Sequence, residues 1–326
     1  MAPPGRGSGP VSVTIVMLSV DEAPLLAHSL PAASAQADCE VLVVDNACTD
    51  ATAELAGRHG ARLLTLPRRL SYCAAVNAGL AAAAGDAILL LNADCVVAPG
   101  FLGALRGHLT DPGVGSVAPK LLRATDVTVT SRREEIDAAA MVVDHRRKNS
   151  LVGHGRPSSR YAVAAEAFGG DGAAVLYRRT TLEHCAVHGE VLDEDFELWA
   201  ADVDLAWRAR LLGWRCAYEP AARAWHVRHY SPSTRHRVQE RHRRLQFRNR
   251  YLMIIKNDTA AALARDLPLV AAWELLALGH VLLRERHLLA AYAQALALAP
   301  AALRRRAVIQ ARRAPGRVAL GLRPPP

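Results

Sequence analysis

The 326-residue chain has few aromatic side chains and lacks the two commonest nucleotide-binding loops. Phe, Trp and Tyr make up 5% of the residues, although 51% of the chain is hydrophobic. No GxGxxG follows the first apolar run, and no GxxxxGK[ST] occurs anywhere in the sequence. These absences argue against a standard dinucleotide-binding fold and against a P-loop nucleotide site.

The chain also lacks the cysteine spacing of a zinc site or of a disulfide framework. Its six cysteines are scattered, and none forms a CxxC pair. Such usage fits a reducing compartment. Residues 1–10 are rich in Pro and Gly without an apolar core, so we expect a disordered N-terminus and no signal peptide. The sequence therefore predicts a cytoplasmic protein.

Positive charge is concentrated in the C-terminal part of the chain. The net charge is +9. From Ser231 onward there are 18 Lys and Arg against 5 Asp and Glu, whereas the first 230 residues carry 22 basic and 26 acidic side chains. Any attraction to phosphate-rich partners is therefore expected at the C-terminal end.

Apolar runs alternate with helical patterns over the first hundred residues. A run without polar alternation is typical of a strand that is buried on both faces. The predicted strands are 11–19, 40–44, 62–66 and 87–91, and the predicted helices between them are 24–30, 51–59 and 71–84. This order favours a parallel α/β sheet with ligands at the carboxyl ends of its strands.

Acidic side chains follow three of these strands, namely Asp21, Asp45 and Asp94. Asp and Asn are common turn formers, so each of these residues alone could simply end a strand. Three carboxylates at one sheet edge repel one another unless a cation or a donor-rich ligand offsets their charge. The pattern therefore favours a site for a divalent cation and phosphates.

Several segments resemble family 2 glycosyltransferases, and most closely their rhamnosyltransferase-like branch, which shows VVDNxSxD and LLNPD. The matching segments are 43–50, 77–79, 84–86, 90–94, 168–179 and 248–257, within a resemblance that covers roughly residues 11–256. The resemblance implies a GT-A-type α/β fold: a Rossmann-like, mostly parallel sheet flanked by helices, with a helical C-terminal extension. The nucleotide-sugar-binding catalytic domain would span 11–232, and a basic amphipathic helical extension would span 233–326.

The resemblance also implies roles for single residues. Asp202 would be the catalytic base, and Asp94 with His226 would hold Mg²⁺ or Mn²⁺. Asp202 could instead only cap a helix, and the family's glutamate before it is replaced by Ala201. Asp171 could instead satisfy turn amides. The residues expected to bind the nucleotide or donor are Asp21, Asp45, Asn46, Asn77, Asn92 and Asp171.

The implied reaction is an inverting transfer of a sugar from a dTDP- or UDP-sugar, with dTDP-rhamnose as one candidate donor. The acceptor would be a hydroxyl of a glycan or of a lipid-linked acceptor, in the synthesis of cell-surface polysaccharide or glycoconjugate. Two alternatives stay open, namely a nucleotide-sugar-binding protein without catalysis and a sugar nucleotidyltransferase.

The basic C-terminal region has several interpretations. Asp266 could cap a helix over 267–283, and 286–303 predicts another helix. Residues 267–283 are too short and too charged for a clear membrane span, so packing or contact with an anionic membrane surface is expected instead. Arginines at 304–306 and 312–313 would strengthen that contact on the inner face of the plasma membrane. A solvated basic face is the alternative, and no nucleic acid partner is expected because no recognised binding motif is present.

Overall fold

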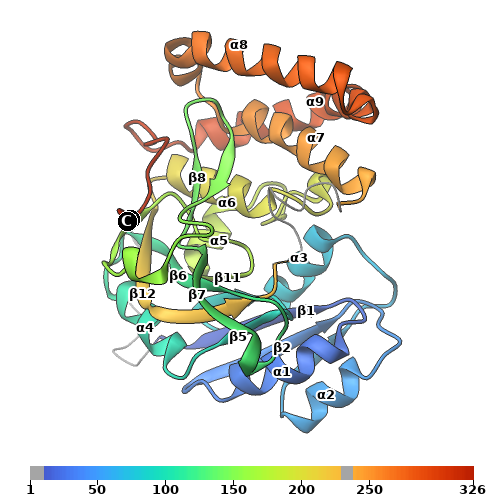
Figure 1. Cartoon of the computed structure of the whole chain (residues 1–326), viewed down its shortest axis with the longest axis vertical. Coiled ribbons are helices and arrows are strands. Elements are labelled where there is room, and N and C mark those ends of the chain that lie inside the picture. The colour runs from blue at the N-terminus through green and yellow to red at the C-terminus, as the bar shows by residue number, and fades with distance from the viewer. Residues whose placement is uncertain (1–10, 229–237) are drawn as a thin grey trace.

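The structure is a computed structural model that describes residues 11–228 and 238–326. The expected disordered segment 1–10 and the expected domain boundary near 232 lie outside the described residues. A large twisted sheet forms the lower body of the molecule, and a layer of long helices lies across its top (Figure 1).

One half of the sheet is parallel and agrees with the predicted alternation. The strands β1 (Val13–Ser19), β2 (Cys39–Asp45), β3 (Arg62–Thr65) and β4 (Ala87–Leu91) pair in the order β3-β2-β1-β4. The helices α1 (Ala23–Ser34), α2 (Thr52–Arg58) and α3 (Tyr72–Ala82) connect them. Parallel strands need such crossovers, and the crossovers leave the carboxyl ends of all four strands at one edge.

The unbroken apolar runs arise because both faces of the sheet are covered. In β1, Ile15 and Met17 pack with α1 on one side, whereas Val16 packs with α3 on the other. In β4, Leu89 and Leu90 are divided in the same way between the two layers. Burial of both faces leaves no position for the polar half of an alternating pattern.

The other half of the sheet is mixed. The strand β11 (Ala174–Arg178) runs antiparallel between β4 and β6 (Val114–Ala124), and β12 (Arg215–His226) lies parallel to β6. Three short strands complete it: β5 (Cys95–Val97), β7 (Arg132–Ala138) and β10 (Ala165–Ala167). The strand predicted over residues 214–218 corresponds only to the beginning of β12. The observed strand continues to His226 because its last residues pair with β5.

Further short elements surround this half of the sheet. They are the hairpin of β8 (Met141–Val143) and β9 (Asn149–Leu151), and the helices α4 (Phe101–Gly107), α5 (Arg179–Cys185) and α6 (Ala201–Leu211). Within this half, the segment 123–165 has no sustained periodicity and folds as short strands and loops, as expected.

The C-terminal helices are not an independent unit. Leu252 of α7 (Glu240–Asn257) and Ile309 of α9 (Leu289–Ala311) belong to the same hydrophobic core as α3 and α6. The helix α8 (Ala260–Leu283) lies outermost, at the top of Figure 1. It is capped by the Thr259 hydroxyl, so the predicted start at 267 with Asp266 as cap is wrong. The alanine-rich stretch before Asp266 is helical because alanine is the best helix former.

A buried ion-pair cluster joins the extension to the sheet domain. The Lys256 ammonium, at the end of α7, lies 2.5 Å from Asp193 Oδ2 and 3.0 Å from Asp204 Oδ1. The Asn257 side-chain amide also donates to Asp204 at 2.7 Å, and Arg208 pairs with the same carboxylate. Because Asp193 and Asp204 flank the start of α6, the extension holds that segment in place.

We expect Lys256→Met to lower the free energy of unfolding by about 3–5 kcal/mol, because it removes the buried cation that two buried carboxylates share and leaves each of them with a single arginine partner. Urea denaturation measures this loss. Arg58→Ala is the control, since its pair with Glu54 is 61% exposed on both sides and should cost no more than about 0.5 kcal/mol. Equal small losses in the two variants would contradict a structural role for Lys256.

Candidate active site

The carboxyl edge of the sheet brings together segments that are far apart in the sequence. The Asn92 backbone N–H, just after β4, donates to the Ala173 carbonyl at 2.9 Å, and the Val227 N–H donates to the Asp94 carbonyl at 3.0 Å. The turn before β11 and the end of β12 therefore lie beside Asp94. Among the described residues, no hydrogen bond of the Asn92 side chain is present.

Asp94 begins a chain of charged side chains. Its Oδ1 lies 3.4 Å from His226 Nε2, and His226 Nδ1 lies 2.8 Å from Asp137 Oδ2. Asp137, at the end of β7, is fully buried. A carboxylate behind an imidazole fixes the orientation of the ring and directs its other nitrogen outward.

Arg228 extends this chain toward α6. Its guanidinium pairs with Asp137 and lies 2.7 Å from Asp171 Oδ2. The next residue, Gly172, donates its N–H to Asp202 Oδ2 at 3.0 Å. A Cβ at Gly172 would lie 3.1 Å from that oxygen, so the close approach of this backbone to Asp202 favours glycine. Asp94 and Asp202 therefore lie at opposite ends of one connected network.

The network shifts the acid–base properties of its members. Burial lowers the pKa of His226, but the Asp94 charge and the Asp137 hydrogen bond outweigh it and raise the pKa to about 10. Burial also opposes ionisation of Asp137, yet His226 and Arg228 hold its pKa well below the usual range. Burial and the nearby Asp171 charge raise the pKa of Asp202 to about 6, which suits a group that accepts a proton near neutral pH.

The carboxylates before and within α6 differ in whether they form salt bridges. Asp193 and Asp204 pair with Lys256, and Glu197 pairs with Arg248. Asp202 makes no salt bridge within the part of the chain that the structure describes. Its Oδ1 accepts only from the Val203 backbone N–H, at 2.8 Å, and its Oδ2 from Gly172.

The acids after β1 and β2 are held by the loops that follow β2 and β3. Asp21, with a left-handed φ of 57°, accepts from the Thr49 backbone N–H and pairs with Arg69 at 2.5 Å. These contacts lower the pKa of Asp21 to about 2. Asp45 Oδ1 accepts from the Cys48 N–H at 2.6 Å. The Asp21 carboxylate is therefore already engaged by the protein, and so is one oxygen of Asp45.

Two predicted donor-binding asparagines brace backbone segments. The Asn46 side chain both donates to and accepts from the Leu70 backbone, at 3.0 and 2.8 Å. The Asn77 side chain does the same with the Leu192 backbone and also donates to Glu194. Both amides therefore shape the loops around the site. Their roles toward a donor stay predictions.

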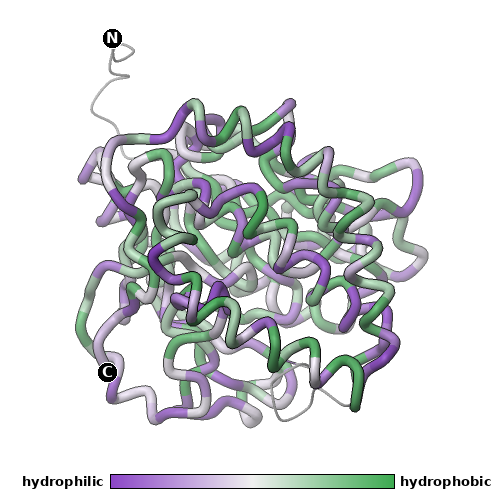
Figure 2. Tube along the Cα trace, turned by 90° about the horizontal axis from the view of Figure 1, so that it is seen from above, coloured by the Kyte–Doolittle hydropathy of each residue, from purple (hydrophilic) through white to green (hydrophobic). Residues whose placement is uncertain are grey.

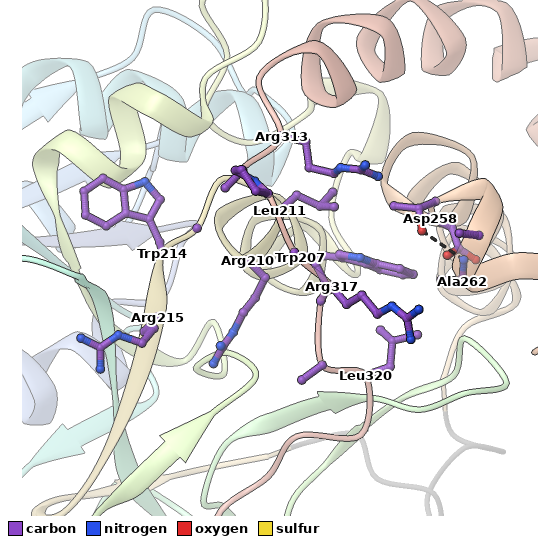
Figure 3. Close-up of a pocket in the computed structure, with 18 of the residues that line it drawn as sticks. Trp207, Arg210, Leu211, Trp214, Arg215, Asp258, Ala262, Arg313, Arg317 and Leu320 are labelled. Atoms are coloured by element: carbon purple, nitrogen blue, oxygen red, sulfur yellow. Dashed lines mark hydrogen bonds between the residues drawn. The ribbon is translucent and has the colours of Figure 1, made fainter. Parts of the chain in front are cut away.

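A cavity of about 480 Å³ lies at the other end of α6, where Trp207, Arg210 and the tail residues Arg313 and Arg317 line it (Figure 3). The arginines around it point in different directions and do not converge on one point (Figure 3). None of the predicted site residues lines this cavity. It is therefore separate from the network that contains Asp202.

The residues at the Asp94 end fit a divalent cation. A carboxylate oxygen and an imidazole nitrogen 3.4 Å apart can both reach one ion at metal–ligand distances of roughly 2–2.5 Å. A second group, formed by Asp21, Cys48 and Asp50, also has its potential ligand atoms within 4.8 Å of one another. There, however, the oxygens of Asp50 already accept from the backbone N–H groups of Ala23 and Thr52.

Sequence reasoning missed two members of the network. Arg228 lies two residues after His226. Because residues i and i+2 of an extended chain point to the same side, the sequence could have suggested that the two side chains lie together. Asp137 lies in the aperiodic segment 123–165, and no sequence signal connects it with His226. Both residues became visible only through tertiary contacts.

Residues 14–180, about half of the chain, match the family described as glycosyl transferase family 2. The chain belongs to this family. The pre-mycofactocin glycosyltransferase of Mycobacterium tuberculosis is 29% identical over 189 residues, which are 57% of this chain and 37% of that protein. The chain thus spans less than half of the length of this relative.

Solved structures show the same fold. The mannosyltransferase PcManGT of Pyrobaculum calidifontis, in complex with GDP-Man and Mn²⁺, has a TM-score of 0.53 at 20% identity over 93% of this chain and 88% of its own. Residues 1–349 of TarS from S. aureus, in complex with UDP-GlcNAc, have a TM-score of 0.57 at 16% identity over 92% and 90% of the two chains. The predicted family and the GT-A-type fold are confirmed.

A pH series tests the charge network. The raised pKa of His226 means that its stabilising contribution is complete below about pH 6.5 and is lost as the pH rises through about 10. In EDTA, the free energy of unfolding of the wild type should therefore decrease as the pH rises through this window. The decrease should be steeper than that of the His226→Gln variant by up to about 1.4 kcal/mol per pH unit. Parallel curves from urea denaturation would show that His226 is not held as an imidazolium.

Proposed function

We propose that this protein is an inverting glycosyltransferase that moves a sugar from a nucleoside-diphosphate donor to an acceptor hydroxyl. One observation supports this most strongly: Asp202 is a partly buried carboxylate that makes no salt bridge to any described residue, and it stands at the end of the network that begins at Asp94 and His226. A partly buried carboxylate with a pKa raised to about 6 is typical of a catalytic acid or base.

In this proposal Asp202 takes the proton of the acceptor hydroxyl. The hydroxyl oxygen then forms a bond to the anomeric carbon as the bond to the diphosphate oxygen breaks, with inversion. Asp94 and His226 would hold a Mg²⁺ or Mn²⁺ ion, which would stabilise the negative charge of the departing diphosphate as a Lewis acid. Asp137 positions His226 by accepting from its Nδ1, and Arg228 holds Asp171 near the donor sugar.

We propose that the nucleotide contacts the ends of β1, β2 and β4. Asp21, Asp45 and Asn92 would contact the base, ribose or phosphates, while Asn46 and Asn77 shape the loops around them. Similarity to PcManGT and TarS, whose structures contain GDP-Man with Mn²⁺ and UDP-GlcNAc respectively, supports a nucleotide sugar and a divalent ion. The rhamnosyltransferase-like motifs make dTDP-rhamnose the first donor to test, followed by UDP-sugars.

We further propose a glycan or lipid-linked acceptor in cell-surface polysaccharide or glycoconjugate synthesis. The protein would act in the cytoplasm, peripherally on the inner face of the plasma membrane. A non-catalytic nucleotide-sugar binder is the second candidate, because Ala201, which is only 2% exposed, replaces the family's glutamate. Released nucleoside diphosphate supports the transferase, released pyrophosphate would indicate a nucleotidyltransferase, and donor binding without turnover would indicate the binder.

Asp202→Asn should lower kcat by about 10²–10⁴-fold with little change in donor affinity, because a general base contributes that much. In the wild type, kcat/KM should fall tenfold per unit below about pH 6, where Asp202 becomes protonated. Nucleoside diphosphate release and calorimetric donor binding provide the two measurements.

Asp195→Asn is the matched control, since it removes a partly exposed carboxylate from the same segment without removing the proposed base. Equal activity of Asp202→Asn and the wild type would refute the assignment of the base. A flat pH profile down to pH 5 would contradict it as well.

Asp137→Asn should raise the Mn²⁺ concentration for half-maximal activity by about 10–100-fold, because a group behind a metal-binding imidazole typically contributes that much. Asp94→Asn, which removes a proposed ligand itself, should have a larger effect. Titration of activity with Mn²⁺ and with Mg²⁺ measures both. An unchanged metal requirement in both variants would place the ion elsewhere.

A further inference from the structure

The helix α8 presents an uncovered apolar surface. It is 24 residues long with a mean hydropathy of 1.5, yet only 11% of its apolar window is buried, and Val270 and Val281 are its buried residues. Its exposed leucines, which we call the leucine face, are Leu267, Leu269, Leu275, Leu276, Leu278, Leu282 and Leu283. Figure 2 looks down on this side of the molecule and shows hydrophobic segments along its helices. An exposed apolar surface of this extent indicates an interaction site.

Polar contacts fix the opposite side of α8 to the protein. Asp266 pairs with the buried Arg147 at 2.6 Å, and Glu274 pairs with Arg250 at 2.6 Å while accepting from the Tyr251 hydroxyl. The helix therefore cannot turn its leucines inward without breaking these pairs. Leaving the protein surface to cross a membrane would break the same pairs, although the length and composition of α8 would allow a span.

The charges around the leucine face have one sign. Within residues 258–326 the carboxylates are Asp258, Asp266, Glu274 and Glu285, and none of these residues is exposed. The exposed arginines in the same region are Arg265, Arg284, Arg286, Arg304, Arg312, Arg313, Arg317 and Arg323. A partner for this surface must therefore be apolar in its interior and negatively charged at its edge.

We propose that α8 lies in the plane of an anionic lipid bilayer, with the leucine face in the boundary between headgroups and acyl chains and the arginines at the phosphates. An interfacial helix of this kind has its apolar side in lipid and its polar side toward water or protein. At about 1.5 Å per residue, α8 would cover roughly 36 Å of membrane surface.

This assignment differs from attraction through the arginine tail. Arg305 pairs with Glu190 of the catalytic domain at 2.7 Å, and Arg306 donates to the Asp258 carbonyl within the extension at 2.6 Å, so both side chains are engaged by the protein itself. The proposed contact is therefore primarily hydrophobic. It is independent of which sugar the enzyme transfers.

The test compares two sets of substitutions by flotation with phosphatidylcholine vesicles that contain phosphatidylglycerol. The triple variant Leu275→Gln, Leu276→Gln, Leu283→Gln should bind at least about tenfold more weakly than the wild type, because burial of even one leucine corresponds to roughly a tenfold change in partitioning. The control variant Val129→Gln, Val163→Gln changes side chains that are 70% and 66% exposed on the catalytic domain, and it should bind like the wild type. Far-UV circular dichroism and thermal unfolding establish that both variants are folded.

The proposal also predicts that wild-type binding persists in part at high salt, since insertion of leucines is not screened. Unchanged binding of the folded leucine variant would overturn the proposal, and so would complete loss of wild-type binding at high salt. Sedimentation analysis tests whether a second copy of this chain covers the leucine face instead. The proposal would be overturned if the wild type were a dimer, the leucine variant were a monomer and neither bound vesicles.

Discussion

Asp94, Asp137, Asp171 and Asp202 meet at the carboxyl edge of the sheet, where their mutual repulsion has to be offset. His226, the last residue of β12, and Arg228, two residues after it, lie between the first three carboxylates and supply the compensating positive charge. This arrangement requires β12 to extend along β6 and β5 as far as His226. The order of strands in the mixed half of the sheet is therefore what makes the site possible.

The second constraint comes from outside the sheet. Lys256 of α7 neutralises Asp193 and Asp204, and Asn249 of the same helix donates to the carbonyls of Phe196 and Trp199. These contacts organise the segment that leads into α6. They give the arginine- and asparagine-rich motif of 248–257 a physical function, which is to hold the loop that precedes Asp202.

Much of the fold was predictable because local patterns determined it. The apolar runs of β1, β2 and β4 and the turns after them are visible in the sequence, and so are Asp94, His226 and Asp202 as residues of interest. The partners of these residues were not predictable, since Asp137 is 89 positions from His226 and only tertiary pairing joins them. Likewise, the sequence shows that α8 is apolar, but only its packing reveals which side faces away from the protein.

The central claim is that the diphosphate and its ion bind at Asp94 and His226. Anomalous diffraction from crystals that contain Mn²⁺ and UDP or dTDP tests it most directly. We predict a manganese peak within about 2.5 Å of Asp94 and His226, with the β-phosphate beside it. A peak at the exposed group of Asp21, Cys48 and Asp50, with no manganese at Asp94, would contradict the claim.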